Sequence, residues 1–196
     1  MVGARESRAV VILNRTHTTC GAAAGAWLGV AVGPEPALAL GGVGLAALAA
    51  FAPDLDHPSA RPVKALGPVG WLLCRILRAI SMATTRVAHR GATHSLLFAL
   101  TLGVSAMLIF LSWLPVLESG YLGGTVFVGV VAALLGDLVT NSGLKHLMWP
   151  LRVVVSIPRG LRIGTGGIVE LYVVFPAVLI ATWAGIGLLL LGGVRA

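Results

Sequence analysis

The chain has 196 residues, of which 57% are hydrophobic and 11% charged, and its mean hydropathy is +0.95. Soluble domains are typically about 25% charged and about 45–50% apolar. The composition therefore excludes a soluble globular fold, a disordered chain and a disulfide-rich scaffold. We expect an all-α integral membrane protein, because helices satisfy their own backbone hydrogen bonds in lipid. Residues 1–196 are expected to form a single membrane-embedded helical domain.

The formal net charge of +7 raises the possibility of nucleic-acid binding. The basic residues lie between apolar segments, however, where topology and anionic lipid headgroups account for them. We therefore expect membrane lipids as partners and no nucleic acid. The sequence gives no indication of an oligomeric state. Cys20 and Cys74 lie far apart and form no CxxC motif, so they do not point to an oxidising compartment.

The first apolar region predicts a tight helical hairpin. Helices are expected over about 18–33 and 36–52, on either side of the turn Gly33-Pro34-Glu35-Pro36. Both segments are short for a span, which needs about 20 apolar residues, so the hairpin either spans a thin region or re-enters. Small residues suit close helix contact in the first segment: Gly21, Ala24, Gly25 and Gly29.

Residues 64–82 predict an amphipathic helix. Apolar residues recur at helical spacing, while Lys64, Arg75 and Arg78 occupy much of the other face. This pattern favours a helix lying in the cytoplasmic membrane interface, with a short buried helix as the alternative.

Three further segments are long and apolar enough to span: 95–114, 120–139 and 170–191. About five transmembrane or re-entrant helices are therefore expected beside the interfacial one. If the N-terminus is cytoplasmic, the basic residues divide unequally. On the cytoplasmic side lie Arg5, Arg8, Arg15, Arg61, Lys64, Arg75, Arg78, Arg86, Arg90, Lys145, Arg152, Arg159 and Arg162. Only Arg195 lies outside, so the positive-inside rule favours this orientation.

The few acidic residues and histidines gather at helix ends on that same side. They are His17, Asp54, Asp56, His57, His89, His94, Asp137 and Glu170. Lys, Arg, Trp and Tyr are the usual residues at headgroup depth, and four converging carboxylates would repel one another. A bound divalent cation relieves that repulsion. His with Asp or Glu favours zinc first, with manganese or iron as alternatives.

Each group also has a simpler interpretation. Asp54 and Asp56 fit a proline-flanked turn, Thr93 or Ser95 could cap the following helix, Asp137 could close a helix, and Glu170 could favour a helix start.

The segments PDLDHPSA, HRGATHS, GDLVTNSGLKHLMWP and TGGIVE, in this order, resemble the YdjM-type family of bacterial and archaeal membrane-bound proteins, to which metal-dependent hydrolase activity is ascribed from motifs. The resemblance covers roughly residues 17–190 and implies a multi-pass protein of the bacterial cytoplasmic (inner) membrane. It also implies all eight residues above as metal ligands. A more distant similarity is to zinc-dependent phospholipases C. The family places a histidine four residues before the aspartate, where this chain has Ala133, so one ligand is missing.

These observations predict a metal-dependent hydrolase that cleaves a phosphoester of a lipid or lipid-linked substrate at the cytoplasmic leaflet. Asp56 or Glu170 would be a ligand or general base, and Arg90 would hold substrate phosphate, because guanidinium matches phosphate geometry. A non-catalytic membrane adaptor is the main alternative. A small transporter fits less well, because the middles of the spans carry no charge.

Overall fold

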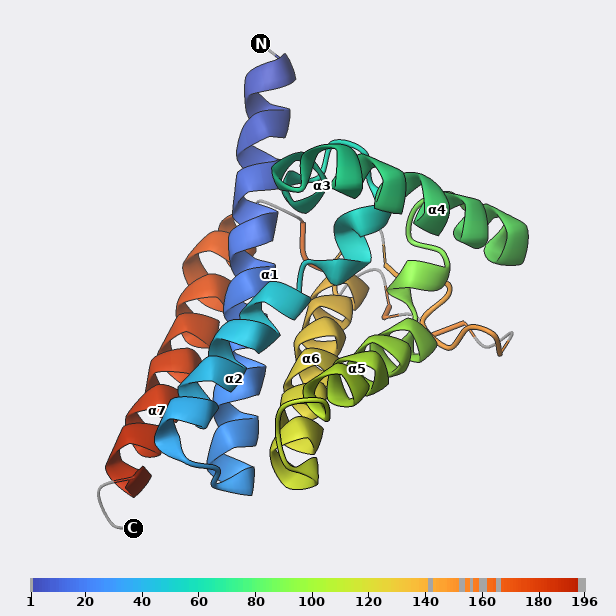
Figure 1. Cartoon of the computed structure of the whole chain (residues 1–196). Coiled ribbons are helices and arrows are strands. Elements are labelled where there is room, and N and C mark those ends of the chain that lie inside the picture. The colour runs from blue at the N-terminus through green and yellow to red at the C-terminus, as the bar shows by residue number, and fades with distance from the viewer. Residues whose placement is uncertain are drawn as a thin grey trace.

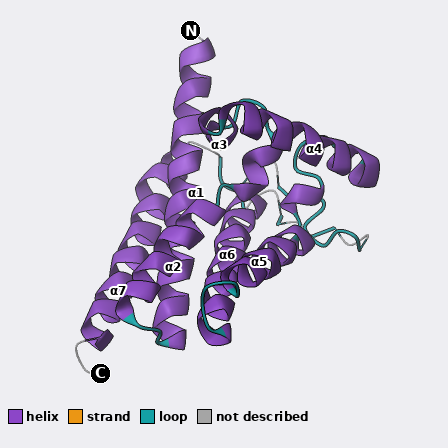
Figure 2. Cartoon of the chain, in the orientation of Figure 1, coloured by secondary structure: helices purple, strands orange, loops and turns teal. Residues whose placement is uncertain are grey.

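The computed structural model contains a bundle of helices with two further helices across one end (Figure 1). It describes residues 2–140, 143–151, 154–155, 157–158, 162–164 and 167–193, with side chains from residue 15 onward. Arg152, Arg159, Arg195 and the side chains of Arg5 and Arg8, which enter the predicted charge asymmetry, lie outside this set. The described part is helical and contains no strand (Figure 2). The expected all-α class is confirmed.

Five helices form the bundle: α1 (Val2–Val32), α2 (Pro36–Ala49), α5 (Leu96–Phe110), α6 (Val116–Leu138) and α7 (Phe175–Gly193). The expected hairpin is present, since α1 and α2 are joined by a short turn in which Gly33 has φ +65°. Helix α1 lies against α2, α6 and α7, and α5 packs mainly on α6. The chain therefore returns repeatedly to the same two ends of the bundle.

Small residues bring the helix axes close together. Gly25 of α1 and Gly129 of α6 both face Ala46 of α2, and a Cβ on either glycine would lie within 3 Å of that alanine. Ala46 is itself fully buried. Such contact favours helix association in lipid, where packing replaces the hydrophobic effect. The predicted role of Gly25 in close helix contact is thus confirmed.

The end of the bundle near the start of α5 carries most of the irregular structure. The 3-10 helix η1 (Ala52–Asp56) follows α2, and η2 (Ala92–His94) precedes α5. Between them, α3 (Arg61–Ala65) and α4 (Gly67–Thr85) cross the end of the bundle (Figure 1). A turn of π-helix, η4 (Glu170–Val174), leads into α7.

The structure corrects the expected helix at 64–82. The helix is broken where Gly67 adopts φ +56°, a conformation that glycine adopts without steric cost. Helix α4 buries Gly70, Cys74 and Ser81 and exposes its large apolar side chains: Val69, Trp71, Leu72, Leu73, Ile76 and Ile80. The segment is therefore amphipathic, as expected, but it is not a buried helix. Its large apolar residues point away from the protein.

The expected spans also change. Among the described residues, three helical stretches are long and apolar enough to cross a membrane: Pro36–Asp56, Val116–Leu138 and Glu170–Gly192. Helix α2 itself ends at Ala49, short of the expected residue 52, and the stretch reaches Asp56 only through η1. Helix α5 ends at Phe110 instead of reaching 114, and turns follow at residues 111–113. Helix α1 starts at Val2, well before residue 18.

Candidate functional site

Four segments of the chain bring seven polar side chains together, and one of them, His17, lies in the middle of α1 and not at a helix end as expected. His17 comes from α1, Asp56 from η1, and Asp137 from the last turn of α6. The loop before α5 supplies His89, Arg90, Thr93 and His94. We call these seven residues the polar cluster. Asp56 and His94 are fully buried, Asp137 is 1% exposed and His17 2%.

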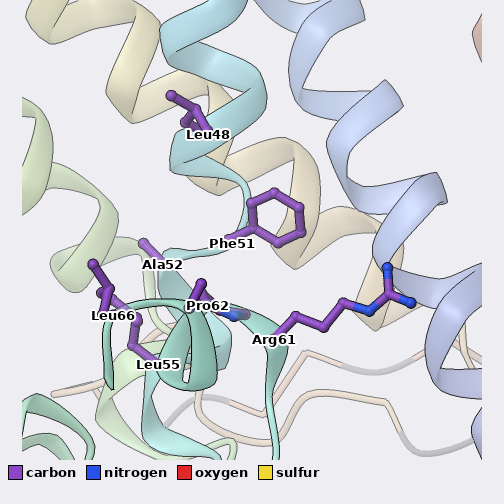
Figure 3. A pocket seen from close by; sticks show the side chains of 8 residues that line it. Leu48, Phe51, Ala52, Leu55, Arg61, Pro62 and Leu66 are labelled. Carbon is purple, nitrogen blue, oxygen red and sulfur yellow. The ribbon is translucent and has the colours of Figure 1, made fainter. Parts of the chain in front are cut away.

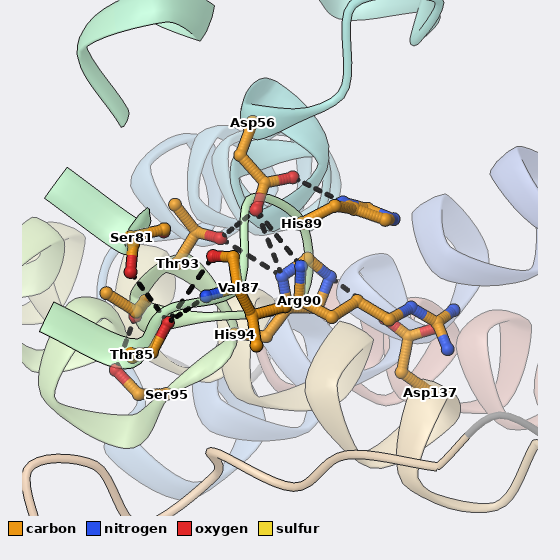
Figure 4. Close-up of polar contacts among 11 residues, drawn as sticks. Asp56, Ser81, Thr85, Val87, His89, Arg90, Thr93, His94, Ser95 and Asp137 are labelled. Atoms are coloured by element: carbon orange, nitrogen blue, oxygen red, sulfur yellow. Dashed lines mark hydrogen bonds and ion pairs between the residues drawn. The ribbon is translucent and has the colours of Figure 1, made fainter. Parts of the chain in front are cut away.

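Asp56 is saturated with hydrogen-bond donors. Its Oδ1 lies 2.6 Å from His89 Nδ1. Its Oδ2 accepts from the Thr93 hydroxyl at 2.5 Å and from the backbone N–H of Arg90 at 3.2 Å. Figure 4 shows these contacts converging on one carboxylate. A buried charge requires such partners, so Asp56 is held as an anion that fixes the loop.

The loop has an unusual backbone at Arg90, whose φ is +59°. This left-handed conformation is disfavoured for residues other than glycine, and the hydrogen bond from the Arg90 N–H to Asp56 helps to maintain it. Gly91 follows, and a Cβ there would lie 2.8 Å from the carbonyl oxygen of Val87. Glycine therefore allows the loop to pack closely beneath the end of α4.

Thr93 links Asp56 to His94 and determines the His94 tautomer. The single Thr93 hydroxyl proton goes to Asp56, so the 3.1 Å contact between Thr93 Oγ1 and His94 Nδ1 requires the imidazole to donate from Nδ1. A neutral His94 then carries its lone pair on Nε2. That nitrogen lies 3.4 Å from Asp137 Oδ2, so an acceptor faces an acceptor.

Asp137 is the second buried carboxylate, and its surroundings differ. Arg90 Nη2 lies 2.8 Å from its Oδ1, and His17 Nε2 lies 3.6 Å from the same oxygen. Within the described part of the chain, neither His17 Nε2 nor His94 Nε2 has a hydrogen-bond partner, although both are buried. Buried polar atoms without partners are rare and indicate an ion or water that belongs there.

The described residues nevertheless contain no group of three His, Cys, Asp or Glu side chains arranged to hold a metal ion. The contacts around Asp137 suggest the reason. His17 approaches one carboxylate oxygen and His94 the other, so the carboxylate stands between the two imidazoles. A common ion would require Asp137 to turn.

The remaining residues of the predicted site lie beside the polar cluster. The His57 ring contacts the His89 ring at 4.7 Å between centroids, and its Nδ1 lies 2.9 Å from Ser59 Oγ. Burial lowers the pKa of His57, with a further lowering from His89. Asp54 is half-buried and acts electrostatically on His57.

Glu170 is buried and accepts a hydrogen bond from the Thr16 hydroxyl at 2.9 Å. With His17 and Cys20 it lines a cavity of about 50 Å³ next to the polar cluster. Glu170 thus shares a cavity with His17 but is not among the described contacts of Asp137.

Sequence reasoning considered Thr93 only as a possible helix cap. Ser95 is the cap instead, accepting from the Phe98 N–H. Its place in the sequence could have indicated this role, because Thr93 lies between the two histidines of HRGATHS and next to His94. Ala133, four residues before Asp137, is fully buried, so the side chain expected there is replaced by a methyl group inside the bundle.

Helices long enough to span a membrane, with a buried polar cluster at one end of their bundle, define an all-α membrane protein. The family model for the YdjM inner membrane protein matches residues 12–194. The chain therefore belongs to the YdjM inner membrane protein family, and the resemblance drawn from its motifs is confirmed. Searches of curated proteins and of solved structures found no match.

Proposed function

We propose that the protein is a membrane-bound, metal-dependent hydrolase that cleaves a phosphoester of a lipid or lipid-linked substrate at the cytoplasmic leaflet. The observation that carries the proposal is the contact between His94 Nε2 and Asp137. A lone pair and a carboxylate that face each other in a buried site need a cation between them or a second proton on the imidazole. Zinc is the first expectation for the cation, with manganese or iron as alternatives.

The donor types suit such an ion, provided that Asp137 turns so that one of its oxygens faces both imidazoles. Zinc binds imidazole and carboxylate at about 2.0–2.2 Å, so two ligand atoms of one tetrahedral ion lie about 3.4 Å apart. The two nitrogen–oxygen distances at Asp137 are 3.4 and 3.6 Å. We therefore assign His17, His94 and Asp137 as ligands. When bound, the metal would lower the pKa of a water ligand and polarise a phosphoryl oxygen.

The other residues of the polar cluster would position and exchange protons. Asp56 holds His89 through Nδ1, which leaves Nε2 of a neutral His89 able to accept a proton from water. The His89 side chain is 34% exposed, so it can reach substrate. Asp56 acts in this scheme as a positioning residue. Ligand roles for Asp54, Asp56, His57, His89 and Glu170, and substrate binding by Arg90, stay predictions.

The test is the metal content of detergent-purified protein after incubation with zinc and removal of excess metal. We expect about one zinc per chain in the wild type and loss of it in His17→Gln and His94→Gln. His146→Gln is the matched control, because His146 lies on a neighbouring segment outside the polar cluster. Phosphatidic acid and phosphatidylglycerol then serve as phosphomonoester and phosphodiester substrates, with products identified by mass spectrometry.

A wild-type protein without metal after reconstitution would contradict the proposal. Loss of as much zinc in His146→Gln as in His17→Gln and His94→Gln would also contradict the proposal. If zinc binds but neither lipid is hydrolysed, the proposed phospholipid substrate is wrong and only the proposed metal site is supported.

One observation favours a second function, a non-catalytic membrane adaptor. Arg90 already supplies Asp137 with a positive charge at 2.8 Å, and a protonated His94 would balance Asp56. The polar cluster would then be neutral without metal and would serve to fix the loop before α5. Two results together would support this alternative. The wild-type protein would contain no metal, and His94→Gln would capture the same membrane partner as the wild type.

A further inference from the structure

A second feature of the structure has no lining residue in common with the polar cluster. It is an apolar pocket of about 430 Å³ between the end of α2, η1 and α3. Its lining includes Leu48, Phe51, Leu55, Pro62, Leu66 and one charged residue, Arg61 (Figure 3). The volume lies within the range of small-molecule sites, about 300–1,000 Å³.

The pocket is open and its apolar walls are accessible. Leu48 is 67% exposed and Leu66 is 49% exposed. Phe51 and Leu55 belong to the stretch Pro36–Asp56, which is long enough to span a membrane. The pocket therefore lies at the end of a candidate span, where acyl chains give way to headgroups. Helix α4, with its exposed apolar side chains, starts directly after Leu66.

The charge at the rim is available to a ligand. Arg61 is exposed, and among the residues that the structure describes no carboxylate forms an ion pair with it. Lys64, on the next turn of α3, is also exposed. A guanidinium matches the geometry of a phosphate, and basic groups at headgroup depth attract anionic lipids.

We propose that this pocket binds one anionic glycerophospholipid of the membrane, with an acyl chain along Leu48 and Leu66 and the phosphate on Arg61. The lipid would stay in place and join α2 to α3 as a bound component of the protein. This inference is independent of the proposed hydrolase, because neither the residues nor the measurement involves the polar cluster.

The experiment is native mass spectrometry of the full-length chain in a non-ionic detergent. The protein is titrated with dioleoylphosphatidylglycerol or dioleoylphosphatidylcholine, which share acyl chains and differ in headgroup charge. We expect the first phosphatidylglycerol to bind about fivefold more tightly than the first phosphatidylcholine, because both carry a phosphate but the choline ammonium cancels the headgroup charge that attracts Arg61. Arg61→Ala should remove this difference.

Two further variants separate the pocket from general surface charge. Arg75→Ala removes the same charge from α4, where Arg75 lies over the Trp71 ring at 4.6 Å, and should change affinity less than twofold. Ala65→Trp fills the pocket from an exposed position and should weaken binding of both lipids. Equal affinity for the two lipids, equal losses in the two arginine variants, or unchanged binding in Ala65→Trp would each overturn the proposal.

Discussion

The two buried carboxylates of the polar cluster lie near each other yet have opposite surroundings. Asp56 accepts from a histidine, a hydroxyl and a backbone N–H. Asp137 accepts from Arg90 and faces two imidazole nitrogens that have no hydrogen-bond partner. A saturated carboxylate has little left to bind, whereas a carboxylate beside unpartnered nitrogens can receive a further cation. The same residue type thus fixes a loop in one place and offers a binding position in the other.

The largest expected effect comes from Asp137→Asn. The change removes a proposed ligand charge and leaves Arg90 without its anion, which costs up to about 3–5 kcal/mol for a fully buried pair and less here, since 22% of the Arg90 side chain is exposed. We expect loss of stoichiometric zinc, measured by mass spectrometry of the purified protein. Asp56→Asn is the comparison and should weaken zinc binding about 10–100-fold, because Asp56 orients the ligand His94 through Thr93 without touching the ion. Equal zinc affinity in both variants would remove the distinction between the two carboxylates.

Thr93→Val should have an intermediate effect. Valine keeps the shape but removes the hydroxyl that donates to Asp56 and accepts from His94. A buried polar group left without its partner costs about 1–3 kcal/mol, so the midpoint of chemical unfolding in detergent should fall. Thr93→Ser retains the hydroxyl and should recover most of the loss. If serine is as destabilising as valine, the methyl group and not the hydroxyl is what matters.

The smallest effect is expected for Asp54→Asn. Asp54 is half-buried and lies on the same short helix as Asp56. Exposed and partly exposed charges contribute about 0–1 kcal/mol, so unfolding and zinc content should both stay close to wild type. A loss of zinc comparable to that in Asp56→Asn would show that the metal site extends to Asp54 and includes the outer part of the predicted ligand set.

Much of the fold could be predicted from composition and spacing. The apolar stretch before Asp137 and the one after Glu170 are helices long and apolar enough to span a membrane, because about twenty apolar residues have few alternatives in lipid. The end of α5 is predicted four residues too late, since apolar content continues through turns and does not mark where a helix ends. The exposure of α4 also had to come from tertiary structure, because an amphipathic pattern does not say what its apolar face meets.

The sequence by itself determined the membrane class, the family and the gathering of His and Asp residues at one end of the helices, because hydropathy and motif order do not depend on how helices pack. Only the tertiary structure decided which of those residues touch. It linked Asp56 with the loop at His89, set the tautomer of His94 through Thr93, and placed Glu170 with Thr16. The first and the last of these contacts join residues that are 33 and 154 positions apart. Hydrogen-bond geometry of this kind depends on helix rotation and depth, which no local pattern encodes.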